Sequence, residues 1–240
     1  VASCGKEPVK YWMHNNMVTI NGQKMGKSLG NAIDLSQFFT GTHPLLERAY
    51  SPMTIRFFVL QSHYRSTLDF TNEALQASEK GYNRLMAANK IAKSMEYPGA
   101  SGEMNLTLDT EIVKVIAQLD EYMKDDFNTA QTLAALFDLT GKLNSIKDGH
   151  IPAASLSAET FALLKKQFTV FVEEVLGLTD EDAASDNGVT DGLMQLVIDI
   201  RKESREKKDY ATSDKIRDAL AELKIQLKDG KDGTGWSHLH

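Results

Sequence analysis

The sequence predicts a mainly α fold, in which an antiparallel helical bundle follows a short segment of strands and loops and precedes a small α+β module. Three observations predict it. Apolar residues recur with the period of amphipathic helices over 71–178. Apolar and polar residues alternate as in strands near the N-terminus. A polar, acidic linker over 179–190 then separates the bundle from a last segment, 191–240, which contains both patterns.

The N-terminal alternation predicts two strands, 9–14 and 17–20. Asn15-Asn16 and Asn21-Gly22 supply turn residues for a hairpin and for the end of its second strand. Residues 23–31, QKMGKSLGN, contain too many Gly, Ser and Lys for a regular core element, so we predict a loop there.

Helices are predicted wherever the apolar period is helical and capping residues frame it. Pro52 belongs to a first turn, Asn128 is a helix cap, Gly177 closes a helix, and Tyr97-Pro98-Gly99 breaks one. The predicted helices are 34–39, 51–60, 71 to about 96, 109–124, 129–146, 157–176, 191–208 and 213–223. A strand, a turn and a second strand are expected over 225–236.

Composition excludes several classes of protein. No apolar run approaches the roughly 20 residues that span a bilayer, and the N-terminus lacks a signal peptide, so a cytoplasmic protein is expected. Cys4 is the only cysteine, which precludes an intramolecular disulfide, and we expect it to be an inert small side chain. The absence of CxxC and HxxxH pairs predicts no metal site in this chain.

Charge is unevenly distributed along the chain. Residues 1–99 carry 11 basic and 7 acidic groups, residues 100–200 carry 6 and 18, and residues 201–240 carry 10 and 8. An acidic middle argues against indiscriminate phosphate binding, so a nucleic acid would have to be held at particular sites.

The stretch Lys24-Met25-Gly26-Lys27-Ser28 carries the clearest chemical signal. Two lysines three residues apart on a glycine-containing loop can both reach one polyphosphate and stabilise negative charge that builds there. A Walker loop is excluded, because that motif needs four residues between its glycines and Gly22 and Gly26 have three. A basic surface turn remains the alternative.

Residues 24–31, KMGKSLGN, resemble the KMSKS signature of class I aminoacyl-tRNA synthetases, with Gly26 where that family usually has Ser. Further segments resemble the cysteine-specific members of the family, in the family's order. These segments are 11–14, 17–20, 55–66, 123–129, 209–218, 225–229 and 233–236.

The resemblance implies a domain order. Residues 1–34 would be the end of a Rossmann-type catalytic domain, 35–70 a connecting region that touches the inner face of the tRNA, 71–178 the helical bundle and 191–240 a small anticodon-binding module. The implied reaction joins cysteine to tRNA(Cys) at the expense of ATP, with Mg²⁺. Lys27 and then Lys24 would contact the ATP phosphates, and Met25, Gly26 and Ser28 would complete the loop. Without its serine hydroxyl, position 26 loses a hydrogen bond that the family could make.

The family's other ATP signature, HIGH, is missing from the sequence, and so are its zinc ligands, which the resemblance would put before Val1. Zinc favours a thiolate over a hydroxyl and would supply selectivity for cysteine. We therefore expect this polypeptide alone neither to activate cysteine nor to bind zinc.

Five residues near the C-terminus are candidates for reading an anticodon: Arg205, Tyr210, Asp214, Arg217 and Asp229. Arg, Asp and Tyr can respectively recognise guanine, accept from an exocyclic amine and stack on an unpaired base. The alternative is a solvated helix face laced with salt bridges. Trp236 is either a stacking residue or a packed core tryptophan.

Two other functions compete with this one. A ligase that joins cysteine to an amino sugar would share the catalytic half but would not need the segment 210–236. A standalone RNA-binding or scaffold module would not need the paired Lys24 and Lys27.

Overall fold

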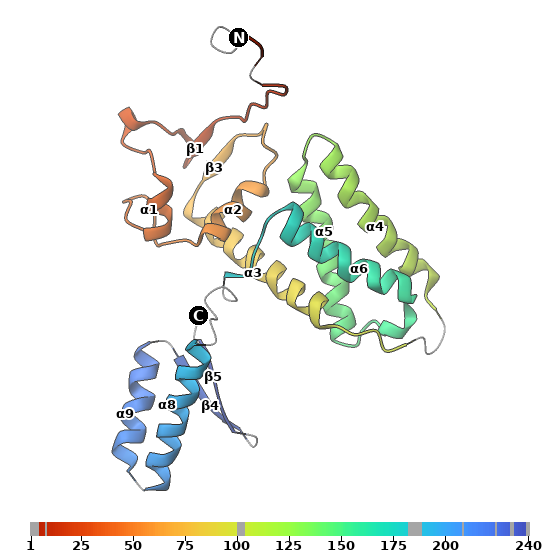
Figure 1. Cartoon of the computed structure of the whole chain (residues 1–240). Coiled ribbons are helices and arrows are strands. Elements are labelled where there is room, and N and C mark those ends of the chain that lie inside the picture. The colour runs from red at the N-terminus through yellow and green to blue at the C-terminus, as the bar shows by residue number, and fades with distance from the viewer. Residues whose placement is uncertain are drawn as a thin grey trace. The chain divides into compact units, whose positions relative to one another are not determined.

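The structure is a computed structural model that describes residues 5–7, 9–99, 104–181, 189–207, 209–223, 225–230 and 233–238. Cys4 and most of the expected linker lie outside the described residues. The chain divides into two compact units, 1–179 and 180–240. The predicted mainly α class is confirmed (Figure 1).

A small sheet opens the first unit. Strand β1 (Val18–Ile20) pairs antiparallel with β2 (Gln23–Lys24) and parallel with β3 (Leu68–Phe70). Two short helices follow the hairpin, α1 (Leu35–Thr40) and α2 (Pro52–Leu60). Together these elements enclose one apolar cluster, formed by Ile20, Ile33, Phe38, Tyr50, Ile55, Phe58, Phe70 and Leu75.

The prediction for the N-terminal strands is partly wrong. Residues 9–16 form no strand, and Tyr11 and Trp12 are 75% and 73% exposed, because no neighbouring strand lies beside them among the described residues. The hairpin turns instead at Asn21-Gly22, where both residues have positive φ, 49° and 75°. Its second strand occupies Gln23–Lys24, at the start of the stretch for which a loop was predicted. The three-residue strand β3 was not predicted.

The helical bundle consists of α3 (Asn72–Ser94), α4 (Leu106–Lys124), α5 (Thr129–Lys147) and α6 (Ala158–Val170), and α6 continues as a π-helix over Phe171–Val175. Each α-helix begins after a side-chain cap, and the four caps are Thr71, Asn105, Asn128 and Ser157. Asn105 starts α4 three residues earlier than predicted. The helices bury one continuous apolar core that includes Leu85, Ile112, Leu136 and Phe168.

The end of the bundle returns to α2. Arg56 on α2 donates from Nε to the carbonyl of Leu176 at 2.8 Å, and the Tyr82 hydroxyl on α3 donates to the carbonyl of Thr179 at 2.6 Å. Gly177 between them has φ 62°, and a Cβ there would lie 2.7 Å from Nη2 of Arg56. The predicted glycine at this helix end is thus favoured by its left-handed backbone conformation.

The second unit contains α8 (Val189–Glu206), α9 (Tyr210–Glu222) and an antiparallel hairpin of β4 (Ile225–Gly230) and β5 (Gly233–His238). Helix α9 begins three residues before the predicted start, because the Asp209 side chain accepts from the N–H of Thr212 at 3.1 Å and caps it. The predicted order of helices and strands is confirmed here.

Candidate functional site

The lysine loop is carried by the β1–β2 hairpin. Thr19 pairs with Lys24 and Ile20 with Gln23, so Asn21 and Gly22 are the two turn residues. Positive φ at both turn positions is typical of the tight turn that matches the twist of paired strands. Lys24 therefore stands at the end of a short, regular strand.

Asp69 on β3 fixes that turn. Its Oδ1 accepts from the Thr19 hydroxyl at 2.6 Å and from the Gly22 N–H at 2.9 Å. Thr19 and Asp69 are also register partners across the parallel pair of β1 and β3. The carboxylate thus holds both the strand and the turn of the hairpin.

Asn31 closes the loop at its other end. Its Oδ1 accepts from the Gly26 N–H at 2.9 Å, and its Nδ2 donates to the Lys24 carbonyl at 3.1 Å. The side chain is buried. Met25 points to the apolar cluster of the first unit and its N–H donates to the Val18 carbonyl at 3.2 Å. The loop backbone is therefore anchored on both sides of Met25.

Both lysines point to solvent. Lys24 and Lys27 are exposed, and neither ammonium forms an ion pair or hydrogen bond with any residue that the structure describes. Ser28 is exposed in a short 3-10 helix, Lys27–Leu29, that ends at Gly30 with φ 67°. Two cations placed so close together on one loop can neutralise a polyphosphate.

Gly26 has an extended backbone, φ −164° and ψ 138°, that any residue adopts. A Cβ at this position would meet nothing closer than the Leu29 side chain at 3.8 Å. The serine that the KMSKS signature has at this position would therefore fit without strain. Glycine here is not required by the fold.

A polar junction joins the loop after α2 to the turn between α4 and α5. The Asp126 carboxylate accepts from the Tyr64 hydroxyl at 2.6 Å and from Arg65 Nε at 2.8 Å. These contacts, the Tyr64 hydroxyl first, lower the pKa of Asp126. Asp126 and Phe127 have positive φ, 57° and 54°, which is uncommon for residues other than glycine. Residues 55–66 and 123–129, which the sequence singled out, thus meet here.

The candidate RNA-reading residues lie in the second unit. Tyr210, Asp214 and Arg217 are all exposed on α9, and their spacing puts them on one face of the helix. Arg205 is exposed near the end of α8. Asp229 lies in β4, and its side chain is outside the described part of the chain.

Ion pairs are present on that face too. Arg217 lies 3.3 Å from Asp214 and 3.1 Å from Asp218, and all three side chains are more than half exposed. Pairs of this kind contribute little to stability and exchange readily with other partners. Trp236 is half-buried in β5, opposite Leu227 in β4.

Within the described ranges, no group of three or more His, Cys, Asp or Glu side chains could hold a metal ion. Within the same ranges, no helix combines the length and the apolarity needed to cross a membrane.

Sequence reasoning found the lysines but not Asp69 or Asn31 as supporting residues. Asn31 was visible only as the last letter of the motif, and Asp69 lies 47 residues beyond the turn that it holds. A signal for Asp69 would have required prediction of β3.

Known proteins match the chain in two ways. Residues 1–80 match the family described as tRNA synthetases class I (C) catalytic domain, and residues 118–180 match the DALR domain. The chain is 50% identical over 238 residues to the cysteine--tRNA ligase of Cytophaga hutchinsonii, which covers 99% of this chain and 47% of that protein.

Two further relatives with the same name are similar. The protein of Parabacteroides distasonis is 50% identical over 98% of this chain and 46% of its own length. The protein of Chlorobium chlorochromatii is 38% identical over 98% of this chain and 46% of its own length. The chain spans about half the length of the curated relatives it matches.

Proposed function

Because this chain belongs to the class I aminoacyl-tRNA synthetases, we propose that it forms the C-terminal part of a cysteine–tRNA ligase. In this proposal residues 1–34 complete the catalytic domain, 35–70 contact the tRNA stem, 71–178 form the bundle and 191–240 read the anticodon. The ligase acts in the cytoplasm, and its substrates are ATP with Mg²⁺, cysteine and tRNA(Cys).

The proposed reaction has two steps. The cysteine carboxylate attacks the α-phosphate of ATP, and the bond to the β-phosphate breaks, which yields cysteinyl-adenylate and pyrophosphate. A hydroxyl of the terminal ribose of the tRNA then attacks the activated carbonyl, and AMP leaves. Residues of this chain contribute charge and position to the first step and RNA contacts to the second.

Lys27 and Lys24 neutralise the charge that develops on the leaving pyrophosphate. The observation that carries this role is that both ammonium groups are exposed and unpaired with respect to the described residues, on a loop clipped by Asn31. Cations that are held ready at the point where charge develops stabilise the transition state without reorganisation. Met25 anchors the loop, while the Gly26 and Ser28 backbone approaches the phosphates.

Zinc, which would select the substrate thiol, belongs to the part of the ligase outside this chain. The described residues offer no cluster of three candidate ligands. In our proposal the selectivity that this chain contributes is for the RNA. Arg205, Tyr210, Asp214, Arg217 and Asp229 make that contact in our proposal, with the exposed Arg217 ion pairs opening toward base edges.

Pyrophosphate exchange in the full-length ligase tests the loop. Lys27→Ala should lower the exchange rate by about 100-fold, the usual loss when one charge-stabilising group is removed. Lys27→Arg should recover part of the rate, and Lys80→Ala, an exposed lysine on α3, is the matched control that should change nothing. This chain alone should show only background exchange. Equal rates for Lys27→Ala and Lys80→Ala would refute the role of the loop.

Filter binding tests the RNA contact with this chain itself. Cysteine tRNA should bind more tightly than the same tRNA with an altered anticodon, and Arg217→Ala should remove most of that difference, since one base contact is worth about 1–3 kcal/mol. Equal affinity for both tRNAs would exclude anticodon reading by this chain.

A further inference from the structure

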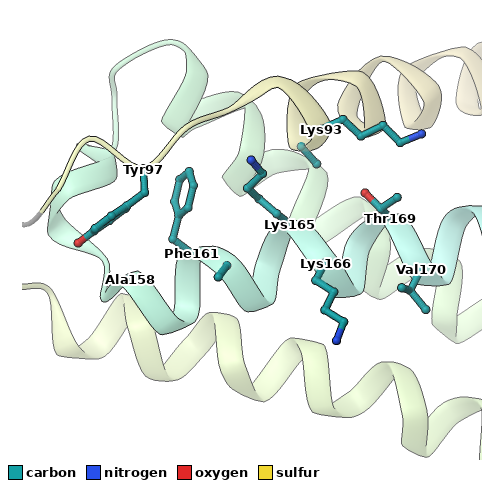
Figure 2. Close-up of a pocket in the computed structure, with 10 residues that line it drawn as sticks. Lys93, Tyr97, Ala158, Phe161, Lys165, Lys166, Thr169 and Val170 are labelled. Atoms are coloured by element: carbon teal, nitrogen blue, oxygen red, sulfur yellow. The ribbon is translucent and has the colours of Figure 1, made fainter.

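An open groove of about 590 Å³ lies on the bundle, between the end of α3 and the outer face of α6 (Figure 2). It is remote from the lysine loop in sequence, and the proposed function assigns it no role. Its volume falls in the range of small-molecule sites.

The floor of the groove is apolar and fixed. Ala158 and Ala162 are exposed one turn apart on α6, and their short side chains leave the hollow open. The Phe161 ring packs at 5.3 Å from that of Tyr97, whose hydroxyl donates to the Leu156 carbonyl at 2.9 Å. Both rings are therefore held in place before any ligand arrives.

Three lysines border this floor: Lys93, Lys165 and Lys166. The Lys165 ammonium donates to the Met95 carbonyl and lies 5.8 Å from the centre of the Phe161 ring. Lys166 is exposed and has no hydrogen bond or ion pair with any described residue. Residues 100–200 contain only 6 basic groups against 18 acidic ones, so two adjacent lysines here are a local reversal of charge.

One end of the groove adjoins the π-helix. Glu173 on that segment accepts from the Lys93 ammonium and from Asn89 Nδ2, the latter at 2.7 Å. Asn89 Oδ1 is buried without a partner among the described residues. Since Glu173 neutralises Lys93, the positive charge of the groove lies mainly with Lys165 and Lys166.

We propose that this groove binds a small amphipathic anion, with an aromatic or aliphatic body and one carboxylate or sulfonate group. The body would cover the alanines and Phe161, and the anionic group would pair with Lys165 or Lys166. The apolar floor offers nothing to a bare phosphodiester backbone, and a purely apolar ligand would gain nothing from the lysines. Charge complementarity together with the fixed floor therefore favours a molecule that combines both properties.

Fluorescence titration of this chain with 1-anilinonaphthalene-8-sulfonate tests the proposal. Its uncharged counterpart, N-phenyl-1-naphthylamine, has the same rings without the sulfonate. The sulfonate dye should bind at one saturable site and more tightly than the neutral dye, and decanoate should displace it. Ala162→Trp, which fills the hollow from an exposed position, should weaken binding at least tenfold.

Lys166→Gln should weaken binding of the sulfonate dye about twofold to fivefold, as expected for one exposed ion pair, and should leave the neutral dye unaffected. The matched control is Lys80→Gln, an exposed lysine on the same bundle about 20 Å along α3 from Lys93. Circular dichroism and melting confirm that each variant folds.

Three results would overturn the proposal. The first is a neutral dye that binds as tightly as the charged one, which would make the groove a simple apolar patch. The second is dye binding that Ala162→Trp leaves unchanged. The third is displacement by duplex RNA but not by decanoate, which would assign the groove to nucleic acid.

Discussion

Asp69 and Asn31 each make two hydrogen bonds to the segment that presents the lysines, and neither belongs to the Lys24–Ser28 stretch. They act on different parts of it. Asp69 holds the turn at Gly22, whereas Asn31 holds the backbone on either side of Met25. Both sets of hydrogen bonds fix the backbone beneath the lysines, whose side chains are exposed.

This division predicts separate effects of two substitutions on amide hydrogen exchange. Asp69→Ala should accelerate exchange at Gly22 about fivefold, since one hydrogen bond contributes about 1 kcal/mol, and should leave Gly26 unchanged. Asn31→Ala should accelerate exchange at Gly26 and leave exchange at Gly22 unchanged. Asp69→Asn retains an acceptor oxygen and should restore slow exchange at Gly22. Exchange measured by NMR that rises equally at both glycines in either variant would mean that the loop opens as one piece.

At the scale of residues, the sequence predicts functional side chains whose partners lie close to them in the sequence. Lys24 and Lys27 stand out because two cations and a glycine within five positions have a direct meaning for phosphate binding. Asp69 could not be found in the same way, because its partner Thr19 is 50 residues distant in the sequence. The strand β3, which carries Asp69 to the side of β1, is also only three residues long. The roles assigned to Arg205, Tyr210, Asp214, Arg217 and Asp229 stay predictions.

At the scale of elements, periodicity predicts the bundle well because each helix has one buried face. The helix predicted over 129–146 is observed over Thr129–Lys147 with the expected Asn128 cap. Alternation over 9–14 misleads, since a strand needs a neighbour as well as a pattern. The π-helix over Phe171–Val175 has no signal in the sequence that we can identify.

Two helical glycines provide a matched pair of substitutions. A Cβ at Gly141 on α5 would meet nothing within 4 Å, so Gly141→Ala should stabilise the protein by about 0.5–1 kcal/mol. A Cβ at Gly81 on α3 would lie 3.0 Å from Cε1 of Phe57, which is fully buried. Gly81→Ala should therefore destabilise by about 1–3 kcal/mol. The urea midpoints of the two variants measure both changes in stability. A Gly81→Ala variant that is more stable than the parent would show that the Phe57 ring can shift.

Asp109 on α4 holds the start of α6. Its carboxylate accepts from the Ser157 N–H at 2.9 Å, the Ser157 hydroxyl at 2.9 Å and the Thr160 hydroxyl at 2.8 Å. Burial opposes ionisation, but these three donors outweigh it and lower the pKa of Asp109 below its ordinary value of 3.8. The ionised carboxylate therefore links two helices of the bundle.

A lowered pKa in the folded state gives stability that is present above the unfolded value and is lost as the pH falls through the folded one. Asp109→Asn should thus cost about 1–2 kcal/mol near pH 7, and the difference from the parent should shrink below about pH 4. Asp120→Asn, at an exposed carboxylate on the same helix, is the control. A difference that stays constant from pH 7 to pH 3 in urea titrations would argue against an ionised Asp109.

At the scale of the whole molecule, the two units have very different cores. The first buries a large cluster that spans α2 to the π-helix. In the second, the buried apolar side chains among the described residues are Met194, Ile198 and Leu220. Small cores give low stability because less apolar surface leaves water.

Urea should therefore unfold the chain in two transitions, with the second unit first. Tyr210, which is 61% exposed on α9, can be replaced by Trp as a reporter of that unit, while far-ultraviolet circular dichroism follows the bundle. Leu220→Ala should move the first transition to lower urea by creating a cavity, and Leu136→Ala should move only the second. One transition that both substitutions shift together would show that the units fold as one.

The contact of Arg56 with Leu176 joins residues 120 positions apart in the chain. The segment that forms the bundle therefore begins just after α2 and ends in contact with the same helix. Extra turns added to the distal ends of α3, α4 or α5 would change the reach of the bundle without displacing Thr179, the point from which the rest of the chain departs. The length of this arm can therefore vary between proteins while the lysine loop stays undisturbed.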